Sequence, residues 1–396
     1  MIRMLSLFSG IGAFEAAMKR IGMPHEVVGF SEIDKYAIRS YCAVHGIDEA
    51  LNLGDITKID VNHLPNDIDL ITYGFPCQDI SLAGKQKGLF NEDGSQTRSG
   101  LFFEALRVIE AAKPKVAIAE NVKNLVGKKF NLQFGIVLRC LEAAGYNNYW
   151  KVLNAKDYGI PQNRERVFIV SIRKDVDTCT FEFPQGFQLN VSLRDVLDQD
   201  VDEKFYISDV ALKGMMEHKK RNLEKGNGFG FNLKTGDDIS PTIRGCYYKD
   251  GQECLVKQIG NCMPTATRDN PNQGRIYDDN GLSPALNAMG GGGRQPFIID
   301  DMYKGRDQRP YDQYSPSLRS ERQGLKVATG EQRLRIRKLT PKECWRLMGF
   351  DDSDFEKAEK VNSNTQLYKQ AGNSIVVDVL VYLLRNIKEL TYEEQI

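Results

Sequence analysis

The sequence predicts an α/β protein in which a mixed, mostly parallel sheet with helices on both faces is joined to a smaller, β-rich domain. Three observations lead to this prediction. Short apolar runs alternate with amphipathic stretches from residue 1 to about 175, whereas residues from about 180 to 330 are rich in Gly, Asn, Asp and Tyr. A helix-like pattern then returns at 340–348 and 376–387. The last helix is therefore expected to rejoin the first domain.

The alternation begins with the first residues of the chain. Residues 4–8 predict a strand, 13–21 a helix, 27–30 a second strand and 36–44 a second helix. Such an order is typical of a parallel sheet whose strands are connected by helices. We accordingly divide the chain into three parts: a first domain over residues 1–178, a second over 179–336, and a hinge segment with a returning C-terminal helix over 337–396.

The composition is that of an ordinary globular protein, because 41% of the 396 residues are hydrophobic and 27% are charged. The net charge is zero, but a local basic surface is sufficient for binding to a polyanion. Residues 319–346 carry nine basic and three acidic side chains. This stretch suits either a phosphate-contacting surface or a solvated charged face.

Cysteine usage and the N-terminus indicate the cellular setting. The eight cysteines have no C-x-x-C spacing, so the sequence indicates neither a metal site nor a disulfide framework. The N-terminus runs directly into a predicted strand, and no apolar stretch is long enough to span a bilayer. We expect reduced thiols, no bound metal, a cytoplasmic location, no membrane contact and, from size and charge, a monomer.

Reactive side chains stand at the ends of several predicted strands. Cys77 lies in Gly-Phe-Pro-Cys-Gln, directly after the apolar run at 68–73, so a thiol is expected at a strand end. Glu120 follows a second apolar run, and Arg164 and Arg166 precede a third. A thiol becomes a nucleophile when nearby positive charge or a helix N-terminus lowers its pKa. Together these groups suit attack on a heterocyclic base.

A glycine turn and two acids indicate a cofactor site near the N-terminus. Gly10 and Gly12 follow the first strand and would let the backbone turn closely around a ligand. Glu15 stands where a dinucleotide fingerprint needs a third glycine, which disfavours a pyrophosphate there. Glu32 and Asp55 would accept hydrogen bonds from ribose hydroxyls and an exocyclic amine. Each acid alone suits a helix cap or the surface, but together they favour S-adenosylmethionine.

The motifs resemble those of the DNA (cytosine-5)-methyltransferase family. Pro-Cys at 76–77, Glu-Asn-Val at 120–122 and Gln-x-Arg-x-Arg at 162–166 occur in the family's order and at similar spacing. Two further signatures, at 337–350 and 372–377, extend the resemblance to the C-terminus. The resemblance covers about 1–175 and 333–390, and the middle corresponds to the family's variable target-recognition region. It implies a Rossmann-like, S-adenosylmethionine-dependent methyltransferase sheet, and we expect DNA to bind in the cleft between this domain and the smaller one.

The resemblance also implies roles for individual side chains. The target cytosine would be flipped out of the duplex, attacked at C6 by Cys77 and methylated at C5. Glu120 would contact cytosine N3 and the exocyclic amine, Arg166 would hold O2, and Arg164 would position the active-site loop. The base that removes the C5 proton is not identified by the sequence. The expected cofactor contacts are Phe8, Gly10, Gly12, Glu32, Ile33, Asp55, Pro76, Leu101 and Asn373.

DNA contacts are expected mainly from a glycine-containing segment over 78–100, which would close over the flipped base. Thr242 belongs to this set, but Thr242-Ile243 departs from the family's usual Thr-Leu pair, so the base-reading residues stay unassigned. The recognition sequence and the presence of a cognate restriction endonuclease are open. The expected DNA contacts are Gln78, Ser81, Lys85, Arg98 and Thr242.

Three alternatives remain beside a sequence-specific enzyme acting on double-stranded DNA in a bacterial or phage-infected cell. A tRNA cytosine-5 methyltransferase has the same catalytic motifs, but its recognition region is short, whereas about 155 residues, from 179 to 333, separate the two blocks here. A non-catalytic DNA-binding regulator is disfavoured by the intact catalytic residues. A nicotinamide-dependent oxidoreductase has only the glycine turn in its favour.

Overall fold

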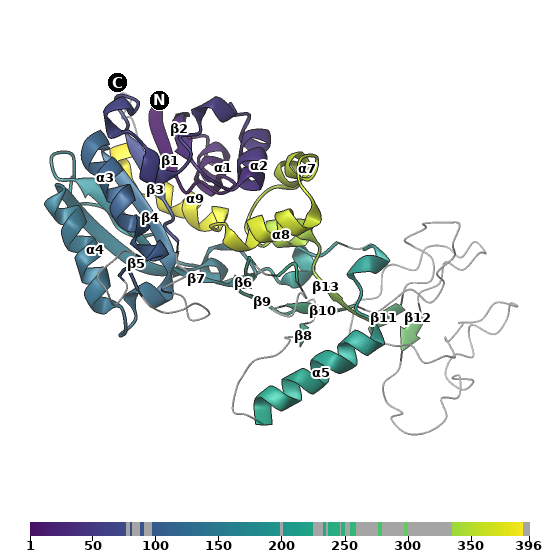
Figure 1. Ribbon diagram of the computed structural model, residues 1–396. Helices are drawn as coiled ribbons and strands as arrows, with labels where there is room; N and C mark the ends of the chain where they lie inside the picture. The colour runs from purple at the N-terminus through teal and green to yellow at the C-terminus, as the bar shows by residue number, and fades with distance from the viewer. Residues whose placement is uncertain are drawn as a thin grey trace, which may run out of the picture. The chain divides into compact units, whose positions relative to one another are not determined.

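The computed structural model describes two compact units of the chain (Figure 1). The larger unit comprises residues 1–196, 237–253 and 340–396, and the smaller comprises 197–236 and 254–339. The larger unit thus takes in two stretches that the expected boundaries group with the second domain. The division into catalytic and target-recognition domains stays a prediction. The described residues are 1–76, 80, 88–90, 97–198, 201–224, 233–234, 237–245, 247–249, 254–258, 276–278, 297–299 and 335–390.

A six-stranded sheet forms the centre of the larger unit, with the strand order β2-β1-β3-β4-β7-β5. The first four of these strands pair in parallel, and β7 is antiparallel to both β4 and β5. The expected α/β class and mixed central sheet are therefore confirmed. The strands are β1 (Ile2–Leu7), β2 (His25–Ser31), β3 (Leu70–Tyr73), β4 (Val116–Val122), β5 (Tyr146–Asn154) and β7 (Glu165–Arg173).

The inner strands are apolar because both of their faces are covered. All four residues of β3 are buried, as expected for a strand in the middle of a parallel sheet. Alternate strand residues such as Leu5, Ile71 and Ala117 share one core with α3 (Phe102–Ala112) and α4 (Asn131–Ala143). Figure 1 shows these two helices to one side of the strands, and α1 and α9 to the other.

The N-terminal and C-terminal helices pack together on the sheet. Helix α1 (Ala13–Arg20) contacts α9 (Val377–Arg385), so both ends of the chain contribute to the larger unit. Helix α2 (Lys35–His45) packs against α7 (Asp352–Glu359). The remaining helices of this unit are α6 (Pro341–Arg346) and α8 (Asn364–Asn373), which pack on each other.

Helix α6 shows why a helix begins near residue 340. Thr340 Oγ1 accepts a hydrogen bond from the Glu343 backbone N–H, and the Glu343 carboxylate accepts one from the Thr340 N–H. This reciprocal capping box satisfies two of the donors at the helix start, and Pro341 suits the first turn because its missing N–H is not needed there.

The described part of the smaller unit contains short strands and one long helix. Its three-stranded sheet has the order β13-β10-β8, and two other strands, β11 and β12, pair in parallel. Helix α5 (Asp209–Glu224), which the sequence analysis does not predict, contributes Leu212 and Met215 to a core around Leu255 and Ile336. The strands are β8 (Leu233–Lys234), β10 (Leu255–Gln258), β11 (Ile276–Asp278), β12 (Phe297–Ile299) and β13 (Arg335–Lys338).

Several basic side chains of the 319–346 stretch have structural partners. Arg337 is fully buried in the smaller unit. In the larger unit, Arg346 forms a two-point ion pair with Asp352, and Lys342 approaches the same carboxylate at 3.0 Å. These three residues therefore do not form a free phosphate-binding surface. Residues 319–334 lie outside the described part of the chain.

Two further findings concern membrane-spanning helices and cysteines. Within the ranges described above, no helix is both long and apolar enough to cross a membrane. The cysteines in those ranges, Cys42, Cys140, Cys179, Cys254 and Cys344, are free thiols.

Candidate active site

The C-terminal ends of β1, β3 and β4 stand level with one another in the sheet. Leu7 pairs with Tyr73, and Tyr73 pairs with Ala119, so the residues that follow each strand leave the sheet at the same edge. Parallel strands present their ligand-binding loops at this edge. The turn at 74–76 follows β3 directly and leads to Cys77. Cys77 and Gln78 lie outside the described residues, so the position of the expected nucleophile stays a prediction.

Glu120 and Arg166 form an ion pair next to this turn. Arg166 Nε lies 3.0 Å from Glu120 Oε1, and the two side chains are only 18% and 12% exposed. The antiparallel register of β4 and β7, in which Val122 pairs with Arg166, brings them together. A Cβ placed on Gly74 would lie 3.7 Å from Glu120 Oε2, so the carboxylate borders the turn that leads to Cys77.

The environment of Glu120 makes its carboxyl easier to protonate than an ordinary glutamate. Burial raises the pKa of the Glu120 carboxyl above its ordinary value, although the charges of Arg166 and Arg164 oppose this shift. A carboxyl with a raised pKa can donate a proton near neutral pH and still accept one later. The site thus contains a proton donor held in place by a guanidinium.

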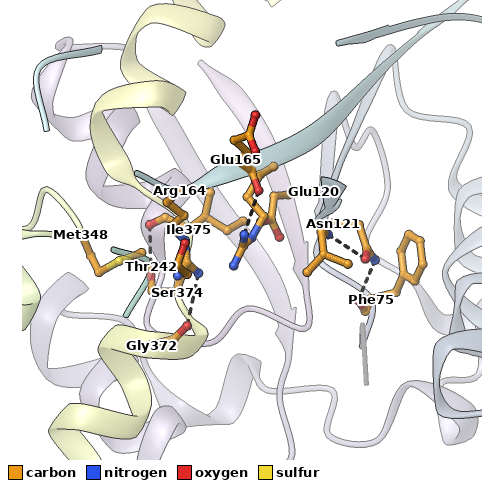
Figure 2. A network of polar contacts seen from close by, with 12 residues as sticks. Phe75, Glu120, Asn121, Arg164, Glu165, Thr242, Met348, Gly372, Ser374 and Ile375 are labelled. Atoms are coloured by element: carbon orange, nitrogen blue, oxygen red, sulfur yellow. Dashed lines mark hydrogen bonds and ion pairs between the residues drawn. The ribbon is translucent and has the colours of Figure 1, made fainter. Parts of the chain in front are cut away.

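Two asparagines that the sequence analysis did not assign hold the chain on both sides of residues 77–79. Asn121 is buried and donates from Nδ2 to the carbonyl of Phe75 at 3.0 Å (Figure 2). Asn124 donates from its side chain to the carbonyl of Ile80. In the sequence, only their closeness to the candidate acid Glu120 could have indicated a role for them.

Arg164 connects three parts of the larger unit. Its side chain is buried, and Nη1 donates to the carbonyl of Ile243 at 2.9 Å. Nη2 donates to the carbonyls of Gly372 and Ser374 at 3.2 and 2.6 Å. Figure 2 shows Arg164 with Gly372, Ser374 and Thr242 nearby. The expectation that Arg164 positions the loop around Cys77 is not tested by these bonds.

The glycine turn after β1 has a left-handed backbone at several residues. Phe8, Gly10 and Gly12 have φ values of 52°, 58° and 79°. A φ in this range is easy for glycine and strained for phenylalanine, which is consistent with a functional turn. Glu32 Oε2 accepts a hydrogen bond from the Gly10 N–H at 3.0 Å, and the His45 ring nitrogen Nε2 lies 2.9 Å from the Ile11 carbonyl.

The candidate cofactor residues Glu32, Ile33 and Asp55 have different environments. The second oxygen of Glu32, Oε1, accepts the backbone N–H groups of Ile33 and Asp34, both at 2.8 Å. The Ile33 side chain is 76% exposed and therefore available to a ligand. Asp55 caps a short 3-10 turn by accepting the N–H and hydroxyl of Thr57 on Oδ1. Asp55 thus has the capping role that an acid at this position would suggest by itself.

A buried acid lies behind the glycine turn. Glu15 is 2% exposed and accepts the Tyr41 hydroxyl at 2.7 Å, and Tyr41 also packs on His45. Burial lowers the pKa of His45, so its ring is neutral and can donate from Nε2 to the Ile11 carbonyl. In the sequence Glu15 only disfavours a dinucleotide, and nothing there indicates its contact with Tyr41.

The remaining candidates are placed as follows. Pro76 is half-buried in the turn after β3, and Leu101 ends the 3-10 turn Arg98–Leu101. Asn373 is the exposed last residue of α8, and a Cβ on Gly245 would lie 2.4 Å from its Oδ1. Thr242 donates its hydroxyl to the Asn163 carbonyl at 2.8 Å. Ser81, Lys85 and the side chain of Arg98 lie outside the described part.

Comparison with known proteins gives a consistent result over the whole length. A family model described as C-5 cytosine-specific DNA methylase matches residues 2–389. The orphan methyltransferase M.Rho11sI of Bacillus phage rho11s is 34% identical, covering 98% of this chain and 97% of that protein. The type II methyltransferase M2.ScrFI of Lactococcus lactis subsp. cremoris is 33% identical over 98% of this chain and 99% of its own length.

Solved structures agree on the fold. The methyltransferase EhMeth of Entamoeba histolytica covers 98% of both chains with a TM-score of 0.65 and 17% identity. The Dnmt2 methyltransferase of S. pombe covers 98% of this chain and 99% of its own with a TM-score of 0.58 and 18% identity. At such identities these structures establish the architecture alone.

Proposed function

The chain belongs to the C-5 cytosine-specific DNA methylase family and is a DNA (cytosine-5-)-methyltransferase, and we propose that it transfers the methyl group by covalent catalysis from Cys77. Membership of this family implies dependence on S-adenosylmethionine. The observation that carries the proposal is the buried pair of Glu120 and Arg166 beside the turn that leads to Cys77. This pair supplies a proton donor and a fixed cation where the base would lie.

The chemistry follows from the weak nucleophilicity of cytosine C5. The Cys77 thiolate would add to C6, forming a C–S bond and moving the ring electron pair toward C5 while Glu120 donates a proton to N3. C5 then bonds to a methyl group, and N3 returns its proton to Glu120. A base removes the C5 proton, and the electron pair restores the C5–C6 double bond and expels the thiolate. The bound cofactor supplies the electrophilic methyl group.

Arg166 would serve both the acid and the substrate. A guanidinium has five N–H donors, so Arg166 can hold Glu120 and still donate to the cytosine O2. Its charge also stabilises electron density that moves onto the ring during the addition. Asn121 would act through the backbone, because its bond to the Phe75 carbonyl holds the start of the turn that carries Cys77.

The residues around the glycine turn fit the cofactor. A Cβ on Gly10 would have no heavy atom within 4 Å, so the turn is open there, and Glu32 Oε2 keeps a lone pair for a ribose hydroxyl while it accepts the Gly10 N–H. The exposed Ile33 and the turn residue Phe8 would enclose the adenine, with Asp55 at its amine. Pro76, Leu101 and Asn373 complete the proposed set.

The substrate would be a specific site in double-stranded DNA. Cytosine C6 is inaccessible in a stacked duplex, so the base must be flipped out. Gln78, Ser81, Lys85, Arg98 and Thr242 are the proposed DNA contacts, and the chain is proposed to act as a monomer in the cytoplasm of a bacterial or phage-infected cell. Relatives are named both orphan and type II methyltransferases, so an endonuclease partner is not part of the proposal.

The test is methyl transfer from labelled S-adenosylmethionine to duplex DNA and, in parallel, to tRNA. Mass spectrometry of the nucleosides identifies the product, and Cys77→Ala is the control. The proposal expects 5-methyldeoxycytidine from the wild type and none from the variant. Label in tRNA alone would move the function to RNA, and label in DNA from Cys77→Ala would exclude Cys77 as the nucleophile.

A further inference from the structure

We propose that Arg164 is a positioning residue that fastens the Thr242–Gly245 segment to the Gly372–Ser374 turn, and so aligns the DNA contact Thr242 and the cofactor contact Asn373 together. This inference rests on the proposed function, because that function assigns Thr242 and Asn373 to their ligands. It differs from the role expected from the resemblance, in which Arg164 acts on the loop around Cys77.

The first observation is the set of atoms that the guanidinium holds. Arg164 is 3% exposed and donates to the carbonyls of Ile243, Gly372 and Ser374. These carbonyls come from segments about 130 residues apart in the sequence. Only a planar fork with several N–H groups can bond them at once, because a lysine ammonium is a compact point charge. The Arg164 charge also opposes the rise in the pKa of Glu120 that burial causes.

The second observation is that the two segments meet backbone to backbone. A Cβ on Gly372 would lie 2.1 Å from the carbonyl carbon of Arg244 and 2.2 Å from the Gly245 nitrogen. A Cβ on Gly245 would likewise lie 2.4 Å from Asn373 Oδ1. A side chain at Gly372 would meet backbone and would therefore force the segments apart, whereas one at Gly245 would meet the side chain of Asn373. The backbone contact requires glycine at position 372.

The third observation is that Ile243 is held at both of its backbone polar groups. Its carbonyl accepts from Arg164, and its N–H lies 3.4 Å from the side-chain oxygen of Gln162. Gln162 also donates to the Leu347 carbonyl at 2.9 Å. The Ile243 side chain is fully buried. This residue, which replaces the family's usual leucine, therefore acts as an internal anchor rather than as a base-reading side chain.

Thr242 and Asn373 are the chain neighbours of the carbonyl groups that Arg164 binds. Thr242 precedes the carbonyl-anchored Ile243, and its hydroxyl donates to the Asn163 carbonyl. Asn373 stands between the two anchored carbonyls of Gly372 and Ser374. One buried side chain thus sets the backbone beside a proposed DNA contact and beside a proposed cofactor contact. Removing the hydrogen bonds of Arg164 should therefore lower the affinity for DNA and the affinity for the cofactor together.

The test compares Arg164→Lys with the wild type in three measurements. Cofactor affinity is measured by calorimetry with S-adenosylmethionine, DNA affinity by fluorescence anisotropy on a duplex the wild type methylates, and kcat and KM by methyl transfer. We expect both affinities to fall by about tenfold or more, since at least two bonds from a charged donor are lost. We expect the loss of kcat/KM to appear mainly in KM.

A second variant tests the junction, by which we mean the contact between the Thr242–Gly245 segment and the Gly372–Ser374 turn, from its other side. Gly372→Ala leaves Arg164 intact but pushes on the Arg244 backbone, so it should lower the affinity for both ligands as well. Because the two changes break one junction, the double variant should be little worse than the poorer single variant. Gly372→Ala also serves if Arg164→Lys does not fold.

The matched control is Arg173→Lys, at the last residue of β7, the strand that begins directly after Arg164. Arg173 also makes three hydrogen bonds, to the Asp175 carboxylate and to the Lys113 carbonyl, but at the other end of β7. It should lose stability without a change in either affinity. The proposal is overturned if Arg164→Lys keeps wild-type affinity for both ligands, or if its affinity falls for only one of them. Absence of methyl transfer by the wild type would instead refute the proposed function; the calorimetric comparison would then test the cofactor half of the proposal by itself, and an unchanged cofactor affinity in Arg164→Lys would overturn it.

Discussion

Replacing Arg166 by methionine should leave Glu120 as a buried carboxylate without its cation. In the wild type the Nε–Oε1 distance is 3.0 Å, and the side chains are 18% and 12% exposed. Arg166 also donates to the Glu165 carbonyl at 2.8 Å. Methionine fills a similar volume, so the change removes charge and hydrogen bonds more than packing.

The size of the effect follows from the burial of the pair. Removing one partner of a buried ion pair costs about 3–5 kcal/mol. Since both side chains of this pair keep some contact with solvent, we expect the lower end, about 3 kcal/mol. For a unit of this size, 1 kcal/mol shifts Tm by about 2 °C, so Arg166→Met should melt about 6 °C below the wild type at neutral pH.

The effect should depend on pH, and its sign is determined by Glu120. The pKa of this carboxyl is already raised in the fold by burial, and loss of Arg166 removes the strongest opposing charge. A carboxyl with a higher pKa in the folded state stabilises that state most in acid, and this stability is lost as pH rises through the raised pKa. The Tm difference between Arg166→Met and wild type should therefore grow from pH 5 to pH 8.

Thermal unfolding followed by circular dichroism at several pH values measures this effect. The double variant Glu120→Gln/Arg166→Met is the control, because it contains no unpaired carboxylate. It should regain roughly half of the lost stability and show a Tm difference that no longer grows with pH. Equal melting of the single and double variants at pH 8 would refute the reasoning, since Glu120 would then not be the source of the loss.

Three further predictions concern the site and its frame. Glu120→Gln should bind DNA as well as the wild type but lower kcat by about 10²–10⁴, and an unchanged kcat in steady-state methylation would exclude a proton donor here. Asn121→Ala should leave the buried Phe75 carbonyl without its donor, cost about 1–3 kcal/mol in urea unfolding and slow single-turnover transfer; wild-type transfer would contradict the positioning role. Thr340→Ala removes a side of the capping box with Glu343 and should cost about 1 kcal/mol in urea unfolding without changing kcat, and no loss of stability would contradict the capping.

The sheet was predictable where apolar runs are short and bounded. The runs at 4–8, 27–30 and 68–73 correspond to β1, β2 and β3, because strands covered on both faces must be apolar throughout. The reversed direction of β7 and its place between β4 and β5 were not predictable, since hydrophobicity does not encode strand direction. Helix α5 was missed because its exposed face is mixed and Gly214 interrupts the pattern.

The candidate site was predictable at side chains with distinctive chemistry and not at those that hold backbone. Glu120 and Arg166 stand out as charged residues at strand ends, and the structure has them in contact. The bonds of Arg164 and Asn121 end on carbonyls of Ser374 and Phe75, and nothing in a sequence shows where a distant backbone passes. Such supporting contacts therefore require a structure.

The most direct test of the account is the identity of the atom that bonds to cytosine C6. A duplex with 5-fluorodeoxycytidine at a methylated site is incubated with enzyme and cofactor. Because C5 then carries fluorine in place of the proton that the base removes, elimination stops and the covalent adduct persists. Mass spectrometry of the digested complex then locates the adduct. The account predicts a methylated nucleotide attached to Cys77 and no adduct with Cys77→Ser. An adduct on another cysteine, or none from an enzyme that methylates ordinary DNA, would contradict it.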